Sequence, residues 1–294
     1  MKALVTGGAG FIGGHLVEML VEDGWDVIVF DNFERASLET LKALPPEVEL
    51  RRIDIRDLES MKRYVNDVDV IFHLAALIDV VESEVKRDEY WDVNVVGTRN
   101  ILEAALGCGS IVVFASSAAV YGDLDKPARE DLKPSPINFY GLTKLEAEKL
   151  CLKYHRKGLR ISILRLFNVF GERARGGVVK IFLEKALHGE PLIIYGDGEA
   201  VRDFIYVKDV AEAFLRASRE EKAFGEVINI GSGKPVKIRE LAELVSTLTG
   251  VEIKYVKRRS GEILFSLADI SKAKNVLNWT PKVRLSKWIE SKLK

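Results

Sequence analysis

A tyrosine and a lysine stand four residues apart in the segment YGLTK, at Tyr140 and Lys144. In a helix this spacing places both side chains on one face, about one turn apart. The pair could transfer protons, or it could belong to an ordinary helix surface, which is the commoner case. It indicates catalysis only if other elements bring a cofactor and a substrate to the same place.

A glycine-rich turn near the start of the chain is typical of a site for such a cofactor. Gly7, Gly10 and Gly13 occur in TGGAGFIGGHL, between an expected strand and an expected helix. Glycines let the turn tighten and let backbone N–H groups approach a pyrophosphate at the positive N-terminus of the helix. Alone, the motif could be a purely structural turn.

The strand that follows ends in an acid, and this supports the cofactor interpretation. Asp31 closes the apolar segment 26–31 and stands 18 residues after Gly13. A carboxylate at this point binds the adenosine ribose and repels a 2′-phosphate, which favours NAD over NADP. Arg35 could attract such a phosphate, but Asp31 holds the stronger position. The sequence therefore predicts an NAD site.

The order of the elements predicts an α/β fold with a doubly wound, Rossmann-like parallel sheet. Short, continuously apolar runs alternate with helical patterns, as in parallel strands that are covered on both faces. The expected strands are 2–6, 26–31, 48–54, 69–76, 110–117 and 160–168, and the expected helices lie near 13–23, 57–66, 88–106 and 137–157.

The alternation loosens after Gly171, which predicts two parts. We expect an NAD-binding domain over residues 1–170 and a smaller, mixed α/β substrate lobe over 171–294. Segments near 203–232 are expected to return to the large sheet. In this half the expected helices are 177–189, 207–219, 238–249 and 269–277, and the expected strand is 227–230.

The composition excludes several classes of protein. Among 294 residues, 44 Lys+Arg balance 44 Asp+Glu, so nothing indicates binding to nucleic acid or to an anionic membrane surface. Cys108 and Cys151 give neither a disulfide framework nor a metal-ligand spacing, and we expect free thiols and no metal. The most apolar run, 68–81, is too short to span a bilayer. The glycine motif leaves no room for a signal peptide, so a cytoplasmic protein is expected.

Three motifs taken together resemble the extended short-chain dehydrogenase/reductase family: TGGAGFIG at 6–13, SSAAVYG at 116–122 and YGLTK at 140–144. More narrowly, the chain is similar to NAD-dependent nucleotide-sugar epimerases, above all to the UDP-glucose (UDP-galactose) 4-epimerases. The similarity runs nearly end to end and includes RLFNVFG at 165–171 and RRSGE at 258–262.

The resemblance implies catalytic roles. Tyr140 would be the acid/base, and Lys144 would lower its pKa and hold the nicotinamide ribose. An unperturbed tyrosine with a pKa near ~10 is a poor base at neutral pH, and an adjacent cation favours the phenolate. Ser117 would hydrogen-bond the reacting hydroxyl. Ser116 and Ser117 alone could be ordinary strand-end residues, and Ser116 is expected to support the cofactor.

The resemblance also implies the cofactor contacts. Asp31 and Asn32 would bind the ribose, Asp54 and Ile55 would lie beside the adenine, and Phe167 would pack near the nicotinamide. The expected set is Gly7, Gly10, Phe11, Ile12, Gly13, Asp31, Asn32, Asp54, Ile55, Leu74, Ala75, Ala76, Asn94, Ser116, Tyr140, Lys144 and Phe167.

For the substrate, the resemblance implies a UDP-sugar. Arg202 and Arg259 match positions that pair with the diphosphate, for which the planar guanidinium is suited. Asn168 would contact the phosphate and sugar end, Tyr195 would stack on uracil, and Glu262 would accept from a ribose hydroxyl. The expected set is Ser117, Tyr140, Asn168, Val178, Ile193, Tyr195, Arg202, Arg259, Glu262 and Ser266.

Some positions depart from the family pattern. Glycine stands at 14 in place of serine, isoleucine at 78 in place of lysine, and glutamate at 262 in place of aspartate. Ile78 removes one cation from the region of the cofactor phosphates. Ser266 falls where the family varies between tyrosine and small residues, and a small side chain leaves room for a 2-N-acetyl group.

The implied activity is NAD-dependent 4-epimerisation of UDP-glucose and UDP-galactose through a transient 4-keto sugar. Ser266 adds the hypothesis that UDP-GlcNAc and UDP-GalNAc are also substrates. The resemblance further implies a homodimer formed through the helices near 88–106 and 137–157.

Two alternatives remain open. An epimerase, reductase or dehydratase acting on another nucleotide sugar would use much of the same machinery. Dehydratases and decarboxylases of this family need an additional acid near the serine, whereas Ala118 and Ala119 follow Ser117 here. A non-catalytic NAD-binding protein would not need Ser117, Tyr140 and Lys144, all of which are present.

Overall fold

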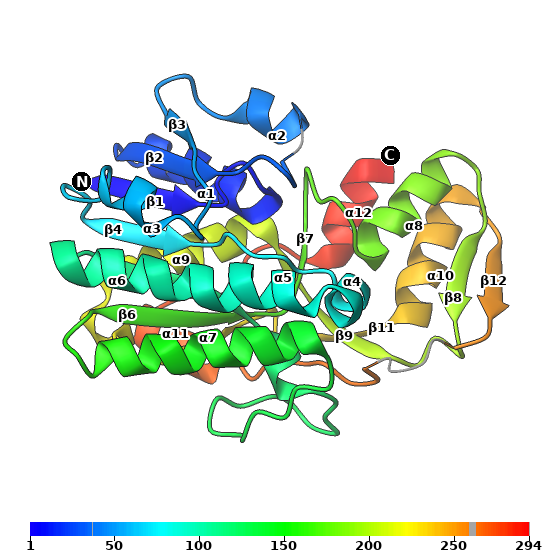
Figure 1. The fold of residues 1–294 in the computed structure, drawn as a ribbon. Coiled ribbons are helices and arrows are strands. Elements are labelled where there is room, and N and C mark those ends of the chain that lie inside the picture. The colour runs from blue at the N-terminus through cyan, green and yellow to red at the C-terminus, as the bar shows by residue number, and fades with distance from the viewer. Residues whose placement is uncertain (37, 259–262, 294) are drawn as a thin grey trace.

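The computed structural model describes residues 1–36, 38–258 and 263–293. A seven-stranded sheet runs through the larger part of the molecule, and every neighbouring pair in it is parallel (Figure 1). The predicted fold class is confirmed. From one edge to the other the strands are β10 (Val227–Ile230), β6 (Ile161–Leu166), β5 (Ile111–Ser117), β4 (Val70–His73), β1 (Lys2–Thr6), β2 (Asp26–Asp31) and β3 (Glu49–Arg52).

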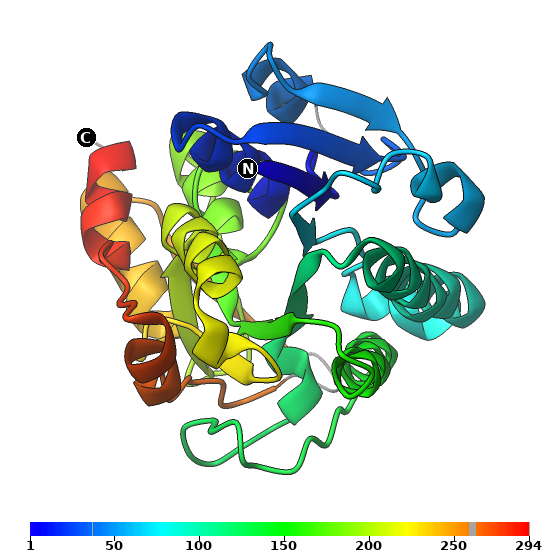
Figure 2. The ribbon, with the colours of Figure 1, turned by 90° about the vertical axis from the view of Figure 1, so that its left-hand side faces the viewer.

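Helices cover both faces of this sheet, which is why its central strands are continuously apolar. On one face the core is closed by α1 (Phe11–Glu22), α9 (Val207–Arg219) and α11 (Ser271–Leu277). On the other face it is closed by α3 (Leu58–Lys62), α6 (Thr98–Cys108) and α7 (Phe139–His155). The long helices α6 and α7 lie side by side (Figure 2).

The smaller lobe has its own sheets and core. β11 (Pro235–Lys237), β9 (Val201–Tyr206) and β7 (Asn168–Phe170) form one sheet, and β12 (Ile253–Val256) pairs with β8 (Leu192–Tyr195). Figure 1 shows these strands with α8 (Val178–Leu187), α10 (Ile238–Thr249) and the C-terminal α12 (Leu285–Leu293) on the opposite side from the N-terminus. These three helices contribute side chains to a single apolar cluster.

The chain passes between the two parts repeatedly. It leaves the large sheet after β6, returns through α9 and β10, and leaves again at β11. Within the segment 203–232, the residues of β9 belong to the lobe, whereas α9 and β10 lie on the large sheet.

Several predicted elements differ from the structure in a way that matters for the site. The expected helix 88–106 is divided into α5 (Arg87–Trp91), a π-helical turn (Asp92–Gly97) and α6. The turn brings Gly97 against Ile55, so closely that a Cβ at Gly97 would lie 2.5 Å from the Ile55 Cδ1 atom. The expected strand 160–168 stops at Leu166, because the next residues pair in the lobe as β7.

Short elements complete the chain: α2 (Leu38–Ala43), α4 (Val80–Val85), and 3₁₀ turns at Ala118–Tyr121 and Glu221–Ala223. The helices α2, α4 and α12 were not predicted from the sequence. Among the described residues, no helix combines the length and apolar character needed to cross a bilayer.

Candidate active site

The glycine turn between β1 and α1 has no room for side chains. Gly7 has a positive φ of 70°, and a Cβ there would lie 2.8 Å from the backbone nitrogen of Ala75. A Cβ on Gly13 would collide with the Gly7 carbonyl. α1 begins at Phe11, and its N-cap residue Gly10 provides no side chain to bind the first N–H groups. The turn therefore exposes the positive end of α1 to an anion.

The carboxylate of Asp31 lies where β2 ends beside this turn. It accepts hydrogen bonds from the backbone N–H of Ala9 (3.1 Å) and of Phe33 (2.8 Å). Burial raises the pKa of Asp31 above its usual range, and these two bonds oppose that effect. Asp31 thus joins the glycine turn to the loop after β2.

The other predicted adenosine residues lie next to Asp31. The amide of Asn32 donates to Asp54 at 3.3 Å, and Arg56 forms an ion pair with Asp54 at 2.6 Å. Chiefly because of Arg56, the pKa of Asp54 falls to about 2. Ile55 is buried, and its carbonyl accepts from Asn100. The sequence analysis missed Arg56.

Asn94 supports the loop Leu74–Ala76, which follows β4. Its Oδ1 accepts from the N–H of Leu77 (2.9 Å), and its amide donates to the Leu77 carbonyl (2.9 Å) and to Thr143 (3.0 Å). Both amide hydrogens of Asn94 are therefore occupied by acceptors of the protein itself. Asn94 connects the loop to α7 through these hydrogen bonds, and direct contact between Asn94 and the cofactor stays a prediction.

The catalytic candidates come from the ends of β5 and α7. Ser117 is the last residue of β5, and its hydroxyl oxygen accepts from the N–H of Ala119 at 3.2 Å. Burial raises the pKa of Tyr140, and the neighbouring Ser117 hydroxyl lowers it. Lys144 is only 3% exposed, and loss of hydration lowers its pKa to about 8. Its ammonium lies 4.6 Å from the centroid of the Phe114 ring.

Ser116 and Phe167 are both buried beside this group. The Ser116 hydroxyl donates to Glu148 at 2.5 Å. Its proton is thus directed into the protein, and the predicted support of the cofactor would have to use its backbone or a lone pair. Phe167 lies between β6 of the large sheet and β7 of the lobe, and its ring packs against the ring of Tyr121.

The first turn of α7 is held by its neighbours. Asn138 is the N-cap and accepts from the N–H of Gly141 at 2.8 Å. The hydroxyl oxygen of Ser83 accepts from the N–H of Tyr140 at 3.1 Å, and Glu84 accepts from the N–H of Phe139 at 2.8 Å. Ser83 and Glu84 belong to α4, which the sequence analysis had not anticipated.

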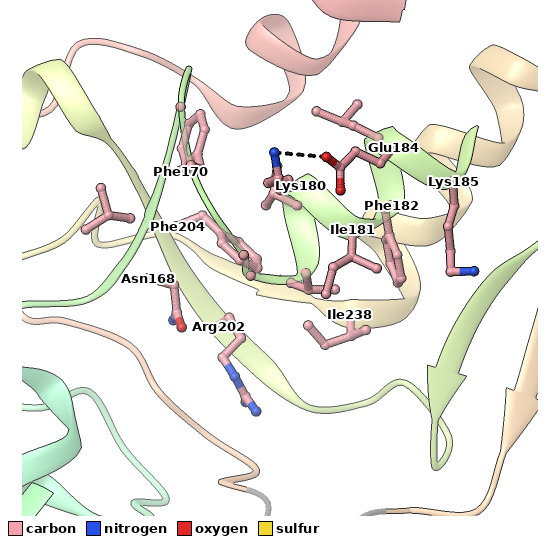
Figure 3. A pocket seen from close by; sticks show the side chains of 18 of the residues that line it. Asn168, Phe170, Lys180, Ile181, Phe182, Glu184, Lys185, Arg202, Phe204 and Ile238 are labelled. Carbon is pink, nitrogen blue, oxygen red and sulfur yellow. Dashed lines mark ion pairs between the residues drawn. The ribbon is translucent and has the colours of Figure 1, made fainter. Parts of the chain in front are cut away.

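A cavity of about 730 Å³ opens in the lobe (Figure 3). Five of the predicted substrate residues line it: Asn168, Val178, Ile193, Tyr195 and Arg202. Figure 3 shows Asn168 and Arg202 near one another, on the side away from the ion pair of Lys180 and Glu184. The sequence analysis missed three further cations of the lining, Arg173, Lys180 and Lys185.

The sheet register connects this cavity to the catalytic residues. Ser117 pairs with Leu166 across β5 and β6, and Asn168 follows two residues later. Ser266 does not belong to the described lining; its N–H donates to the Val201 carbonyl, next to Arg202. Arg259 and Glu262 lie outside the described residues.

Within the described part of the chain, no cluster of His, Cys, Asp and Glu could hold a metal ion. Both cysteines are free thiols, and Cys151 is buried.

Comparison with known proteins identifies the family. The family model described as "NAD dependent epimerase/dehydratase family" matches residues 3–231, and the chain belongs to this family. NAD as cofactor is confirmed, and the chain is an enzyme of this family. The glycine turn, the uncapped start of α1 and the carboxylate of Asp31 fit NAD.

Three similar proteins illustrate the range of activities. A UDP-N-acetyl-alpha-D-glucosaminuronate decarboxylase of Bacillus cytotoxicus is 42% identical over 87% of this chain and 82% of its own length. A UDP-glucuronate 4-epimerase of Thermodesulfobacterium geofontis is 34% identical over 98% and 93%. The crystal structure of UDP-glucose 4-epimerase from Thermotoga maritima with UDP-glucose superposes with a TM-score of 0.94, at 37% identity, over 100% and 97% of the two chains.

Proposed function

We propose that this enzyme epimerises C4 of a UDP-hexose, with UDP-glucose and UDP-galactose as the substrate pair. The observation that carries the proposal is the meeting of Ser117, Tyr140 and Lys144 where β5 ends, beside a cavity whose lining includes Asn168 and Arg202. NAD-dependent conversion of a nucleotide sugar is common to the family; the sugar and the C4 position are the proposal.

The chain's own residues suit proton transfer at the 4-hydroxyl. Tyr140 would remove the proton, and Ser117, whose hydroxyl influences the pKa of the phenol, would hold the same oxygen. A protonated Lys144 one turn away would favour the phenolate. NAD supplies reversible hydride acceptance, so a transient 4-keto sugar can be reduced from either face with no net redox change.

The cavity lining also suits the nucleotide. Arg202, together with Arg259, would bind the diphosphate, and Asn168 would contact the sugar-phosphate end. Val178 and Ile193 would contact uracil through the backbone, with Tyr195 stacked on the base. Under this proposal residues 1–170 hold NAD and residues 171–294 hold the UDP-sugar, apart from α9, β10 and α11, which lie on the large sheet.

Decarboxylation of a UDP-uronate is the second candidate, because the 42% identical relative carries out such a reaction by its name. Oxidation at C4 would need the same serine, tyrosine and lysine. The 3₁₀ turn after Ser117 begins with Ala118 and Ala119 and thus lacks the additional carboxylate expected of decarboxylases. This favours epimerisation.

The test is a ¹H NMR assay of the NAD-bound protein with UDP-galactose, UDP-N-acetylgalactosamine and UDP-glucuronate in separate tubes. We expect UDP-glucose to form from UDP-galactose without net NADH. A UDP-pentose and CO₂ from UDP-glucuronate would establish the second candidate instead. No turnover of any of the three would move the proposal to another nucleotide sugar.

The N-acetyl hypothesis has its own test. Ser266 is half-buried beside the strand that carries Arg202, and a relative acts on an N-acetylated sugar. Replacing Ser266 with Tyr should remove activity on UDP-N-acetylgalactosamine and keep activity on UDP-galactose. An unchanged ratio of the two rates would contradict the hypothesis.

We also propose a homodimer. The helices near 88–106 and 137–157 carry exposed apolar side chains, Trp91, Leu106 and Leu142, which a second copy would cover. Light scattering coupled to size exclusion should give twice the chain mass, and Trp91→Glu with Leu106→Glu should give the chain mass. A monomeric native protein would refute it.

A further inference from the structure

A buried ion pair lies behind the catalytic residues. The guanidinium of Arg165, on β6, donates to both oxygens of Glu148, on α7, at 2.9 and 2.7 Å. The two residues are only 3% and 2% exposed. The Ser116 hydroxyl, from β5, donates to the same carboxylate at 2.5 Å. Three elements of the large domain therefore converge on Glu148.

Glu148 lies on α7 at a regular spacing from the two catalytic candidates of that helix. Tyr140, Lys144 and Glu148 are separated by four residues each, so they follow one another along one face of the helix. Arg165 lies over the ring of Tyr121, at 4.6 Å from its centroid. Its Nη1 atom has no hydrogen-bond partner.

Stability does not account for such a pair. Removing two charges from water costs several kcal/mol per ion, and apolar replacements of similar volume are often neutral or stabilising. The unsatisfied Nη1 of Arg165 adds to the cost. The pair must therefore be considered for its effect on its neighbours, among them Lys144, which stands one turn before Glu148 on α7.

Several titratable groups are packed around Lys144. Burial raises the pKa of the Cys151 thiol, on the same helix, and lowers that of His73, at the end of β4, to about 3. Both are therefore uncharged at neutral pH, as is the Tyr140 phenol. Among these described neighbours, Glu148 supplies the negative charge. Burial lowers the pKa of Lys144, whereas its neighbours Cys151 and Glu148 raise it.

We propose that Glu148 is a positioning residue that keeps the Lys144 ammonium charged and in place, and that Arg165 and Ser116 hold its carboxylate for this purpose. The inference rests on the proposed function in that Lys144 there serves proton transfer by Tyr140. Arg165 holds the Glu148 carboxylate in its buried position through two hydrogen bonds, and the single O–H···O contact from Ser116 links the pair to the strand that carries Ser117.

The test is an NMR titration of Lys144 in the NAD-bound protein labelled with ¹⁵N,¹³C-lysine, with Lys144→Met to assign the signal. In Glu148→Gln an anion is lost, and the pKa of Lys144 should fall by ~1 unit or more. In Arg165→Met a cation is lost, and the pKa should rise. The two variants break the same ion pair, so structural damage alone would not shift the titration in opposite directions.

Folding of the variants is checked by circular dichroism. If a single variant fails to fold, the double variant Glu148→Gln/Arg165→Met leaves no unpaired buried charge, and its Lys144 should titrate between wild type and the expected value for Glu148→Gln. A Lys144 titration that is the same in wild type and in the folded variants would overturn the inference.

Measurements of kcat distinguish a failure of this inference from a failure of the proposed function. The high-pH limb of the kcat profile should move down in Glu148→Gln, following the NMR titration. If Tyr140→Phe and Lys144→Met retain full turnover, the proposed function is wrong, and the titration still decides the charge relation. If those variants are inactive and the titration does not move, the inference alone is wrong.

Discussion

Tyr140 and Lys144 are each poor at their proposed task when considered alone. Burial raises the pKa of the phenol and lowers that of the ammonium, so each loses some of its charged form. Their closeness on α7 opposes this, because each charge stabilises the other. The spacing in the sequence was enough to predict that Tyr140 and Lys144 act as a pair. It did not predict how deeply the two side chains are buried, or that Glu148 is buried next to them in an ion pair. The contact between Glu148 and Arg165 joins residues 17 apart on two different elements.

The first residue-scale prediction concerns the phenol. Tyr140→Phe should lower kcat for UDP-galactose by roughly 10²–10⁴-fold, the usual contribution of a general acid/base. Tyr154→Phe, on the same helix but bonded only to Glu103, is the matched control and should keep full activity. A rate within twofold of wild type in Tyr140→Phe would contradict the role.

The second concerns the stability cost of Lys144. Its folded pKa of about 8 lies below its ordinary 10.5, so the unfolded chain binds more protons between these values. Wild type should therefore gain stability as the pH rises from about 8 to 10.5, relative to Lys144→Met. At pH 7 Lys144→Met should be more stable by on the order of 2 kcal/mol. Thermal unfolding of both proteins at pH 7 and pH 10 measures this; a less stable Lys144→Met at pH 7 would refute it.

Among the elements, α7 illustrates how a helix can depend on its neighbour. Ser83 and Glu84 of α4 accept hydrogen bonds from the first N–H groups of α7. The position of Tyr140 therefore depends on α4, which follows the loop Leu74–Ala76. Sequence patterns identify the central strands of the large sheet, because their apolar runs are nearly continuous. The six-residue α4 lacks a clear apolar period, and the π-helical turn depends on the packing of Gly97 against Ile55, so neither could be predicted.

Ser83 provides the prediction at this scale. Ser83→Ala removes the acceptor of the Tyr140 N–H and should cost about 1 kcal/mol of stability, as for a lost N-cap. Displacement of Tyr140 should lower kcat by roughly tenfold, with little change in KM. Ser291→Ala, on the exposed C-terminal helix, is the control. Loss of stability without any loss of kcat would show that α4 supports the fold only.

For the whole molecule, the seventh strand of the large sheet, β10, comes between two parts of the lobe: β7, α8, β8 and β9 precede it, and β11, α10, β12 and α12 follow it. β10 pairs with β6, and α9 covers the face on which α1 lies. We predicted from the sequence that segments near 203–232 return to the sheet, because 227–230 has the pattern of a buried strand. The strands β7, β8 and β9 were not predicted, since they are short and half-buried, and their pairings depend on the lobe as a whole.

This topology gives the prediction at the largest scale. A fragment that ends at residue 170 lacks β10, α9 and α11, so β6 becomes an unpaired edge and one face of the sheet keeps only α1 as cover. We expect it to aggregate and to lack cooperative unfolding, as judged by size exclusion and circular dichroism. A monodisperse fragment with a cooperative transition would establish residues 1–170 as an independent unit.

The repeated passage of the chain between the sheet and the lobe also bears on how a substrate reaches the cavity. A lobe attached by one linker can swing, but here β7, α9 and β11 each follow directly on a segment of the other part. Opening would have to bend all these connections together. Uptake and release should therefore occur through local movement of the cavity wall near Gly171 and Gly177, and crystals of the enzyme should tolerate soaking with UDP-galactose without cracking.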